Sequence, residues 1–381
     1  MKLLTSLLVF LFGLFGINLS ALPIKESSSV ISRTEYSGKV YHIFFHSLIL
    51  YPELAFQSDT AEGYNDWMTT RAEFKKILQK LYENDFILVD IDEVRAAKLA
   101  NKPLVLPEGK KPLILSVDDV NYYDYMRGDG FADRLVADKN GRIAAAVITP
   151  SGDTVIDYEG DVMPIVDNFV EKHADFSLDG AKGIVAVTGF QGVFGYRITT
   201  LKDNALTEAQ NEAEQVASAL KKSGWKIACH SYSHTRDFRD GSITLARLAL
   251  DTEKWIEKIA PVTGTTNIYI SPFGISFSGK DERLAYLVFK GYNIFCPVSK
   301  TMNVMLYGRC LISERLNFDG FTMQKYPQRI TSAFFPLDGI LDKNRPSFYE
   351  ERRSTLLNQK TALVERYSED MTILAIRPKP V

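Results

Sequence analysis

Two histidines and two neighbouring aspartates are the side chains of this sequence whose types and spacing could do chemistry. His230 and His234 stand four residues apart in the segment HSYSH, in a chain with only five histidines. If this loop enters a helical turn, both imidazoles face one side, which suits a metal ion bound by two histidine nitrogens. Asp118 and Asp119 follow the apolar run LILSV. One carboxylate added to the two histidines would complete a metal site with open positions for water and substrate.

Each of these groups follows a short apolar run that predicts a buried strand, and so does a third histidine, His46. Active sites on parallel β/α folds lie at the carboxyl ends of the strands, so we expect these groups to meet at one edge of a sheet. Structural alternatives stay open, because an aspartate pair can cap a helix and two loop histidines can be solvent-exposed. His46 can be a core histidine, and His42, on the same face of its strand, competes with it for any chemical role.

Short apolar runs alternate with amphipathic segments along most of the chain, which is the pattern of parallel β/α units. The pattern predicts helices over 69–84 and 207–223 and strands over 111–117, 183–189 and 225–229. About seven such units favour a deformed (β/α) barrel over an open sheet. No G-x-G-x-x-G or phosphate-loop motif supports nucleotide binding. Residues 142–158 break the rhythm with two β-rich runs around a turn signal at 150–153, which predicts a β-hairpin insertion.

The motifs around these residues resemble those of the polysaccharide deacetylases, carbohydrate esterase family 4. SVDD at 116–119 resembles the family's TFDD motif, and HSYSH at 230–234 is similar to its H-[ST]-x-x-H metal motif. SPFG at 271–274 resembles the R-x-P-x-G loop, and FHSLI at 45–49 resembles the acid-bearing segment of extracellular members whose motif order is permuted. The resemblance spans roughly residues 40–330 and implies an α/β fold, a deformed (β/α) barrel.

The resemblance also implies a role for each residue. Asp118 becomes the catalytic base, and Asp119 binds the metal together with His230 and His234. His46 becomes the general acid, because no histidine follows His234. The cofactor is then a divalent metal, with zinc suiting these ligands and cobalt or nickel also fitting. The substrate and the reaction's oxyanion are expected against Pro272, Phe273, Gly274 and Tyr122.

Two departures from the family pattern bear on activity. Val120 stands where the family has a glycine, and Ser271 stands where it has the arginine that contacts the base. Arg197, Arg309 and Arg315 are candidates to replace that arginine, and the sequence does not rank them.

The implied function is a metal-dependent hydrolase that removes N-acetyl or O-acetyl groups from an extracellular or cell-wall polysaccharide, such as peptidoglycan, in a bacterium. One alternative is a non-catalytic glycan- or cell-wall-binding protein on the same fold. Another is a metal amidase or esterase with a non-sugar substrate, since one site can hydrolyse different acyl groups. The formal net charge of −2 argues against a nucleic-acid partner.

The first 21 residues have the pattern of a secretory signal peptide, with Lys2 before an uncharged apolar run and the small Ser20 and Ala21 after it. We therefore expect a secreted or cell-surface protein. A membrane contact is expected only if the segment stays uncleaved, because the run is near the lower limit for a span. The remaining chain divides into a linker (22–39), a deacetylase-like barrel (40–335) with an insertion at about 121–180, and a C-terminal extension (336–381). Its three scattered cysteines do not form a disulfide framework.

Overall fold

The computed structural model describes residues 32–277 and 279–347. The expected signal peptide, most of the expected linker and the end of the C-terminal extension lie outside the described residues. Among the described ranges, no helix combines the length and the hydropathy that a membrane span needs.

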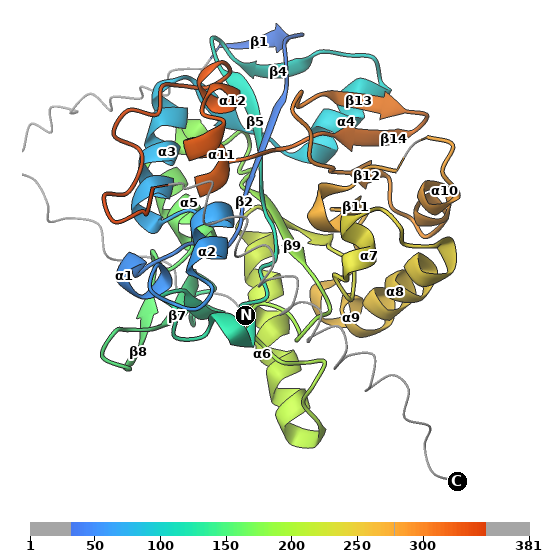
Figure 1. Cartoon of the computed structure of the whole chain (residues 1–381). Coiled ribbons are helices and arrows are strands. Elements are labelled where there is room, and N and C mark those ends of the chain that lie inside the picture. Colours follow the sequence, from blue (N-terminus) through green and yellow to red (C-terminus); the bar gives the residue numbers. More distant parts are fainter. Residues whose placement is uncertain (1–31, 278, 348–381) are drawn as a thin grey trace, which may run out of the picture. The chain divides into compact units, whose positions relative to one another are not determined.

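One curled, mostly parallel sheet of ten strands carries the fold (Figure 1). In order across the sheet, the strands are β13 (Val304–Tyr307), β14 (Cys310–Ser313), β12 (Ile294–Phe295), β11 (Ile268–Tyr269), β10 (Trp225–Cys229), β9 (Gly183–Val187), β5 (Lys111–Val117), β2 (Tyr41–Phe45) and β15 (Leu316–Asn317). The tenth strand, β3 (Phe86–Leu88), pairs with the first residues of β5. Every ladder of this sheet is parallel except the β13–β14 hairpin.

Within the described residues, no ladder joins the edge strands β13 and β15, so the sheet is a half-barrel rather than a closed ring. The expected α/β fold with a deformed barrel is confirmed. The seven or so strands that the sequence indicated correspond to β2, β3, β5, β9, β10, β11 and β12, and the three further strands, β13, β14 and β15, have two to four residues each. Segments this short show no periodicity in the sequence.

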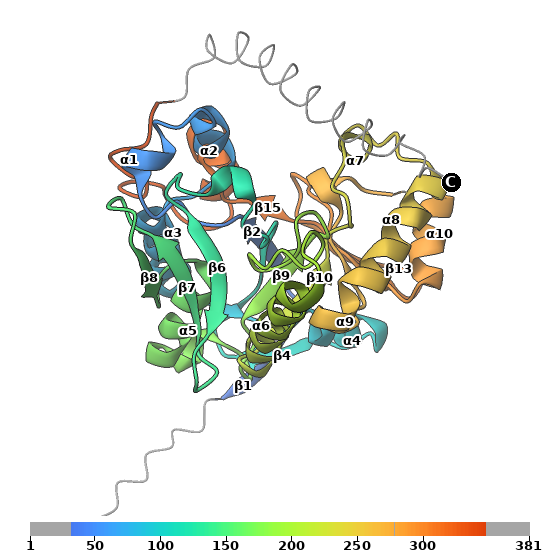
Figure 2. The same cartoon turned by 90° about the horizontal axis from the view of Figure 1, so that it is seen from below.

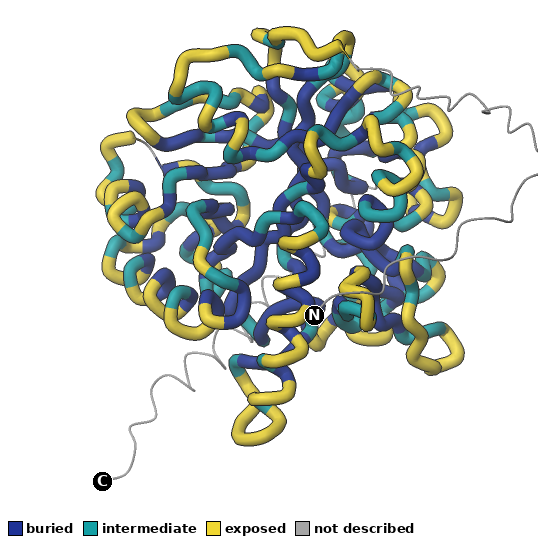
Figure 3. Tube along the Cα trace, turned by 180° about the vertical axis from the view of Figure 1, so that it is seen from behind, coloured by how far each residue is buried: buried dark blue, intermediate teal, exposed yellow. Residues whose placement is uncertain are grey.

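The central strands are buried on both faces, as parallel strands covered by helices usually are. In β5, Leu113, Leu115 and Val117 belong to one core cluster, and Ile114 belongs to a second cluster on the other face. Figure 3 shows the buried strands surrounded by exposed loops and helix faces. This burial is why near-continuous apolar runs such as KPLILSV mark these strands in the sequence.

Helices flank the sheet, and the longer ones are α3 (Arg71–Glu83), α4 (Ile91–Leu99), α5 (Val162–Lys172), α6 (Asp203–Lys222), α8 (Leu245–Lys258) and α10 (Glu282–Phe289). Shorter helices are α1 (Pro52–Ala55), α2 (Ala61–Trp67), α7 (Arg236–Arg239), α9 (Ala260–Thr263), α11 (Gly320–Lys325) and α12 (Gln328–Thr331). Three single turns are η1 (Asp124–Met126), η2 (Ala174–Phe176) and η3 (Pro272–Gly274). The helix predicted over 69–84 begins after a capping box formed by Thr70 and Glu73 and buries Phe74, Ile77 and Leu81.

The expected hairpin insertion is part of a separate three-stranded antiparallel sheet, seen beside α5 in Figure 2. Its strands are β6 (Ala132–Ala137), β7 (Ile143–Ile148) and β8 (Thr154–Asp157). The turn signal at 150–153 joins β7 to β8, as the sequence predicted. Strand β6 was not predicted, because its six residues ADRLVA show no polar–apolar alternation that would distinguish them from a loop.

Both ends of the described region are attached to the main fold. Strand β1 (Arg33–Tyr36) lies in the segment that the sequence indicated as a linker and pairs antiparallel with β4 (Leu104–Pro107). At the other end, the buried guanidinium of Arg345 donates to both carboxylate oxygens of Glu73 at 2.6 Å. This ion pair joins the first part of the expected C-terminal extension to α3.

Candidate metal-binding site

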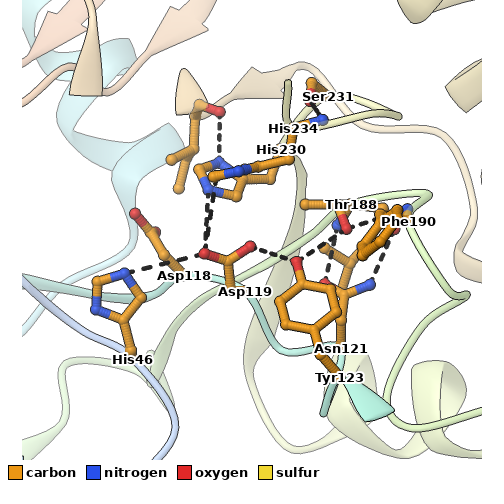
Figure 4. Close-up of polar contacts among 12 residues, drawn as sticks. His46, Asp118, Asp119, Asn121, Tyr123, Thr188, Phe190, His230, Ser231 and His234 are labelled. Carbon is orange, nitrogen blue, oxygen red and sulfur yellow. Dashed lines mark hydrogen bonds and ion pairs between the residues drawn. The ribbon is translucent and has the colours of Figure 1, made fainter. Parts of the chain in front are cut away.

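Three strands bring the side chains that the sequence singled out to one edge of the sheet. Strand β5 leads into Asp118 and Asp119, β10 leads into His230, and β2 leads into His46. Strands β2 and β5 are neighbours, and β9 separates β5 from β10. Figure 4 shows Asp119 between His46 on one side and His230 with His234 on the other.

One carboxylate oxygen of Asp119 faces three imidazoles. Its Oδ2 lies 3.8 Å from Nε2 of His234 and 4.0 Å from Nε2 of both His230 and His46. The ligand atoms of Asp119, His230 and His234 all lie within 4.8 Å of one another. Donor atoms this close can reach one ion at about 2.0–2.2 Å after small side-chain shifts. Two imidazoles and a carboxylate are a donor set that fits a divalent metal such as zinc.

The hydrogen bonding of His230 leaves the nitrogen that faces the centre free to bind a metal. Its Nδ1 lies 2.7 Å from the carbonyl oxygen of Ile270, which can only accept, so Nδ1 carries the proton. The lone pair is therefore on Nε2, which points at Asp119. An imidazole oriented by such an outer hydrogen bond is the usual arrangement of a metal-binding histidine.

The electrostatics of the cluster favour the protonation states that metal ligands need. Burial by itself would raise the pKa of Asp119, but the three imidazoles and a hydrogen bond from Tyr123 outweigh it and hold this pKa at about 2. Burial lowers the pKa of His234 below its usual value, despite the attraction of Asp119. At neutral pH, Asp119 is therefore an anion and His234 is neutral.

Backbone strain is concentrated in the loops of this site. Asp119, Ser231, His234 and Phe273 have φ angles of 56°, 62°, 48° and 55°, in the left-handed region that residues with a side chain seldom adopt. Each such conformation costs about 1–3 kcal/mol and persists only where surrounding contacts impose it. Four of them in the loops that follow β5, β10 and β11 indicate that these loops are shaped for a function.

Hydrogen bonds from a neighbouring helix hold the HSYSH loop in this conformation. Ser231 Oγ accepts from the backbone N–H of His234 at 3.0 Å. Asp251, on α8, accepts from the backbone N–H groups of Tyr232 and Ser233 at 2.7 and 2.8 Å. Sequence reasoning missed Asp251, because nothing in a helical segment 18 residues later marks it as a partner of this loop.

Tyr123 orients the carboxylate of Asp119. Its hydroxyl donates to Oδ1 of Asp119 at 2.6 Å, which leaves Oδ2 to face the histidines (Figure 4). Its ring stacks on Tyr125 at 5.7 Å, and Tyr125 is 51% exposed.

The structure does not bring Tyr122 to the substrate side, where the sequence placed it. This residue is 2% exposed, and its hydroxyl donates to the buried carboxylate of Asp161. Adjacent loop residues point in different directions, so the next residue, Tyr123, is the one that reaches the site. A choice between consecutive tyrosines depends on backbone angles that no residue pattern specifies.

Asp118 forms a buried ion pair with Arg315. The guanidinium donates from Nη1 to Oδ1 at 2.7 Å and from Nη2 to Oδ2 at 2.9 Å. Its Nε donates to the carbonyl of Cys296 at 2.9 Å, and the group lies 4.3 Å from the ring centre of Phe44. Burial would raise the pKa of Asp118, but the charge of Arg315, helped by nearby histidines, outweighs it and the pKa is lowered. Asp118 is therefore ionised at neutral pH.

Of the three arginines that the sequence left unranked, the structure puts Arg315 on Asp118. Arg197 instead pairs with Asp124 at 2.8 Å, and Arg309 is exposed. The guanidinium contact that Ser271 lacks is thus supplied from the segment between β14 and β15. The other departure, Val120, is fully buried in the core, so its side chain does not intrude on the site.

The SPFG segment forms a tight turn beside the histidines. Pro272, Phe273 and Gly274 make up η3, and α7 packs against it. The Phe273 ring is 46% exposed and lies 4.5 Å from the His234 ring, measured between centroids. A side chain at Gly274 would meet Val298 at 2.3 Å, so a glycine is required here. Phe273 thus presents an apolar surface next to the proposed ligands.

His42 and His46, which compete in the sequence for a chemical role, have different surroundings. His46 is partly exposed and faces Asp119. His42 is fully buried, and its ring nitrogens lie 2.8 Å from Ser313 Oγ and 3.1 Å from Ser116 Oγ. Only His46 is therefore placed where it can reach a substrate.

Comparison with solved structures finds the same kind of fold in known deacetylases. The fold is similar to that of carbohydrate esterase family 4 deacetylases. The deacetylase PplD from Streptococcus pyogenes, solved with acetate, is 13% identical, with 80% of this chain and 100% of that chain covered and a TM-score of 0.45. A de-N-acetylase from Aggregatibacter actinomycetemcomitans is also 13% identical, with 76% and 96% covered and a TM-score of 0.45. A family 4 pseudoenzyme from Bacillus anthracis is 12% identical, with 48% and 61% covered and a TM-score of 0.25.

At these identities and scores the likeness says nothing about the activity of this chain. No protein-family model and no curated protein sequence matches it.

Proposed function

We propose that this protein is a metal-dependent hydrolase that removes acetyl groups from a polysaccharide outside the cytoplasm. The observation that carries the proposal is the convergence of Asp119, His230 and His234 beside a second aspartate, Asp118, that is buried and ionised. A divalent cation bound there, in our proposal zinc, would polarise a water molecule and the acyl carbonyl. The apolar segment at the start of the sequence supports the location.

In the proposed reaction, Asp118 is the general base that accepts the proton of the attacking water. Its pairing with Arg315 keeps it ionised, as a base must be, and fixes both of its oxygens. His46 is the general acid, which donates a proton from Nε2 to the departing group. It lies on the other side of Asp119 from His230 and His234 and is not one of the proposed metal ligands (Figure 4).

The surface next to the ligands supports a sugar as the substrate. Phe273 and Tyr125 expose about half of their surface at the strand ends that carry the histidines and the aspartates. Flat aromatic faces with a polar edge suit a sugar ring, which has an apolar face and hydroxyls around it. The substrate proposed is therefore an acetylated glycan, with Pro272 and Gly274 shaping the turn that presents Phe273.

The Asp118–Arg315 pair also favours a catalyst over a binding protein with a decayed site. Unlike the buried Glu73–Arg345 pair, which joins two parts of the chain, this pair keeps an ionised carboxylate directly next to a proposed metal ligand, where it can accept a proton from water. A substrate panel distinguishes glycan deacetylation from hydrolysis of a non-sugar amide or ester. It compares chitin oligomers, peptidoglycan fragments and acetyl-xylan with simple acyl compounds.

The decisive experiment compares bound metal and acetate release in Asp119→Ala, His230→Ala and the wild-type protein. We expect both variants to lose metal and acetate release together. His173→Ala is the matched control, because His173 ends α5 and contacts Phe169 and a tyrosine instead of the cluster. Full metal content and full activity in both site variants would refute the proposed function.

The acid role of His46 has its own test. His46→Ala should keep its metal and lose most of its turnover on an N-acetylated glycan, because no other histidine faces Asp119 from that side. Unchanged turnover would assign the proton to another donor.

A further inference from the structure

A buried histidine lies behind the proposed base and is connected to it. His42, in the middle of β2, has no solvent exposure. Its Nδ1 lies 2.8 Å from Ser313 Oγ at the end of β14, and its Nε2 lies 3.1 Å from Ser116 Oγ on β5. A polar ring in the core of a parallel sheet is costly unless both nitrogens are paired, as they are here.

The contacts of His42 continue without a break to the proposed base. Ser116 Oγ also accepts from Nη1 of Arg315 at 3.1 Å, and the same Nη1 donates to Asp118 Oδ1 at 2.7 Å. Ser313, His42, Ser116, Arg315 and Asp118 are each at most 4% exposed. They form one buried chain of hydrogen bonds that runs from β14 through β2 and β5 to the site.

The arginine fixes the direction of the hydrogen bonds that it makes in this chain. A guanidinium has only donors, so Ser116 Oγ must accept from Arg315. The hydroxyl hydrogen of Ser116 is then available to Nε2 of His42, and in that tautomer the ring proton is on Nδ1 and is donated to Ser313. Burial, and then the charge of Arg315, lowers the pKa of His42 well below its usual value, so the ring is neutral.

We propose that His42 and Ser116 are positioning residues, which hold the Arg315 guanidinium in the plane that pairs it with both oxygens of Asp118. The inference rests on the proposed function, in which Asp118 is the base. Nη1 is the nitrogen shared by Ser116 and Asp118, so losing the serine contact removes one of the two bonds that fix its direction. A base displaced by a fraction of an ångström from the water that it serves slows the reaction strongly.

A purely structural role makes a different prediction. If His42 and Ser116 only fill the core, their removal lowers stability and leaves the turnover of each folded, metal-loaded molecule unchanged. If they position the base, kcat falls while KM and metal content stay the same, because neither residue contacts the ligand cluster or the exposed surface.

The test uses the full chain and measures kcat, KM, bound metal and the melting temperature. Ser116→Ala and His42→Leu should lower kcat by about ten- to a hundredfold, the range for residues that orient a reactive site from behind, with metal content unchanged. Ser116→Thr keeps the hydroxyl and should restore most of the turnover. Thr252→Val is the control, since it removes a buried hydroxyl on α8 that has no hydrogen-bond partner among the described residues, and its kcat should not change.

Wild-type kcat in Ser116→Ala at full metal content overturns the inference, and so does a kcat loss that is matched by loss of metal. Ser116→Ala alone carries the test if His42→Leu does not fold. A second readout does not need activity: NMR of the Arg315 guanidinium should show slow rotation in the wild type and faster rotation in Ser116→Ala. If the wild type releases no acetate, the proposed function is refuted. The rotation rates then decide by themselves whether the hydrogen bonds of His42 and Ser116 hold the Arg315 guanidinium.

Discussion

Replacing Arg315 by methionine tests whether the buried pair with Asp118 controls both the charge of that carboxylate and the stability of the fold. Arg315 has no solvent exposure, and Asp118 is 4% exposed. Methionine is unbranched and apolar, so it can occupy much of the same space without a charge. The variant therefore leaves a buried carboxylate with no cation beside it.

The expected cost is set by the loss of that pairing. Contacts of 2.7 and 2.9 Å put the charge centres roughly 4 Å apart, where two unit charges attract by about 4 kcal/mol at an effective dielectric constant of about 20. Removing one partner of a buried pair typically costs about 3–5 kcal/mol, because the other charge stays buried. We expect Arg315→Met to lose about 3–5 kcal/mol of unfolding free energy at pH 7.

The difference in unfolding free energy between the wild type and Arg315→Met should depend on pH. In the wild type the pKa of Asp118 is lowered, so its stabilising contribution is present above the unfolded value of about 3.9 and is lost as the pH falls through the folded value. Without Arg315, burial raises the pKa of Asp118 and the carboxyl group becomes neutral more readily. The difference between wild type and variant should therefore be largest near neutral pH and shrink toward pH 4.

Urea unfolding of both proteins at pH 7 and pH 4, with a chelator present to remove metal linkage, measures these differences. Arg309→Met is the matched control, because Arg309 is exposed and its loss should change stability by no more than about 0.5 kcal/mol. A loss below about 1 kcal/mol at pH 7, or one that is as large at pH 4, would refute this account of the pair.

Three further predictions concern the surroundings of the site. Burial raises the pKa of Asp161 to about 6, so its stabilising contribution is complete below about pH 4 and is lost as the pH rises through 6. Asp161→Asn should abolish this loss of about 3 kcal/mol in urea unfolding between pH 4 and 8. Tyr123→Phe removes the hydroxyl from Asp119 and should weaken metal binding about ten- to a hundredfold in a chelator competition titration. Phe273→Ala should leave metal content unchanged and raise KM for a glycan more than it lowers kcat, because its exposed ring is beside His234 and is not a ligand.

The sequence predicted the positions of the chemical groups better than it predicted their partners. Asp118 and His230 could be placed because apolar runs mark buried parallel strands, and the residue after such a run lies at the active edge of the sheet. The partner of Asp118 is 197 residues away in the chain, and the strand order brings it there. No local pattern distinguishes Arg315 from Arg309, since the two flank the same short strand, β14, and only tertiary packing buries one and leaves the other exposed.

The same limit explains the errors at Tyr122 and in the strand count. A left-handed backbone angle of 51° at Tyr122 decides that this ring enters the core and that Tyr123 reaches Asp119. A strand of two residues such as Leu316–Asn317 is defined by its neighbour in the sheet and has no periodicity of its own. What is missing from the sequence in each case is tertiary context.

The position of Arg315 also changes how the departure at Ser271 is understood. When the SPFG segment is compared with the family motif position by position, Ser271 replaces an arginine, which suggests a decayed site. In the proposed reaction the requirement on Asp118 is geometric, however: a cation must lie against both of its oxygens, and any strand end that faces the carboxylate can provide it. Arg315 meets that requirement from the segment that runs from β14, near one edge of the sheet, to β15, at the other edge. Without Arg315, Asp118 would be an unpaired buried carboxylate, so the ion pair that completes the proposed active site also stabilises the fold.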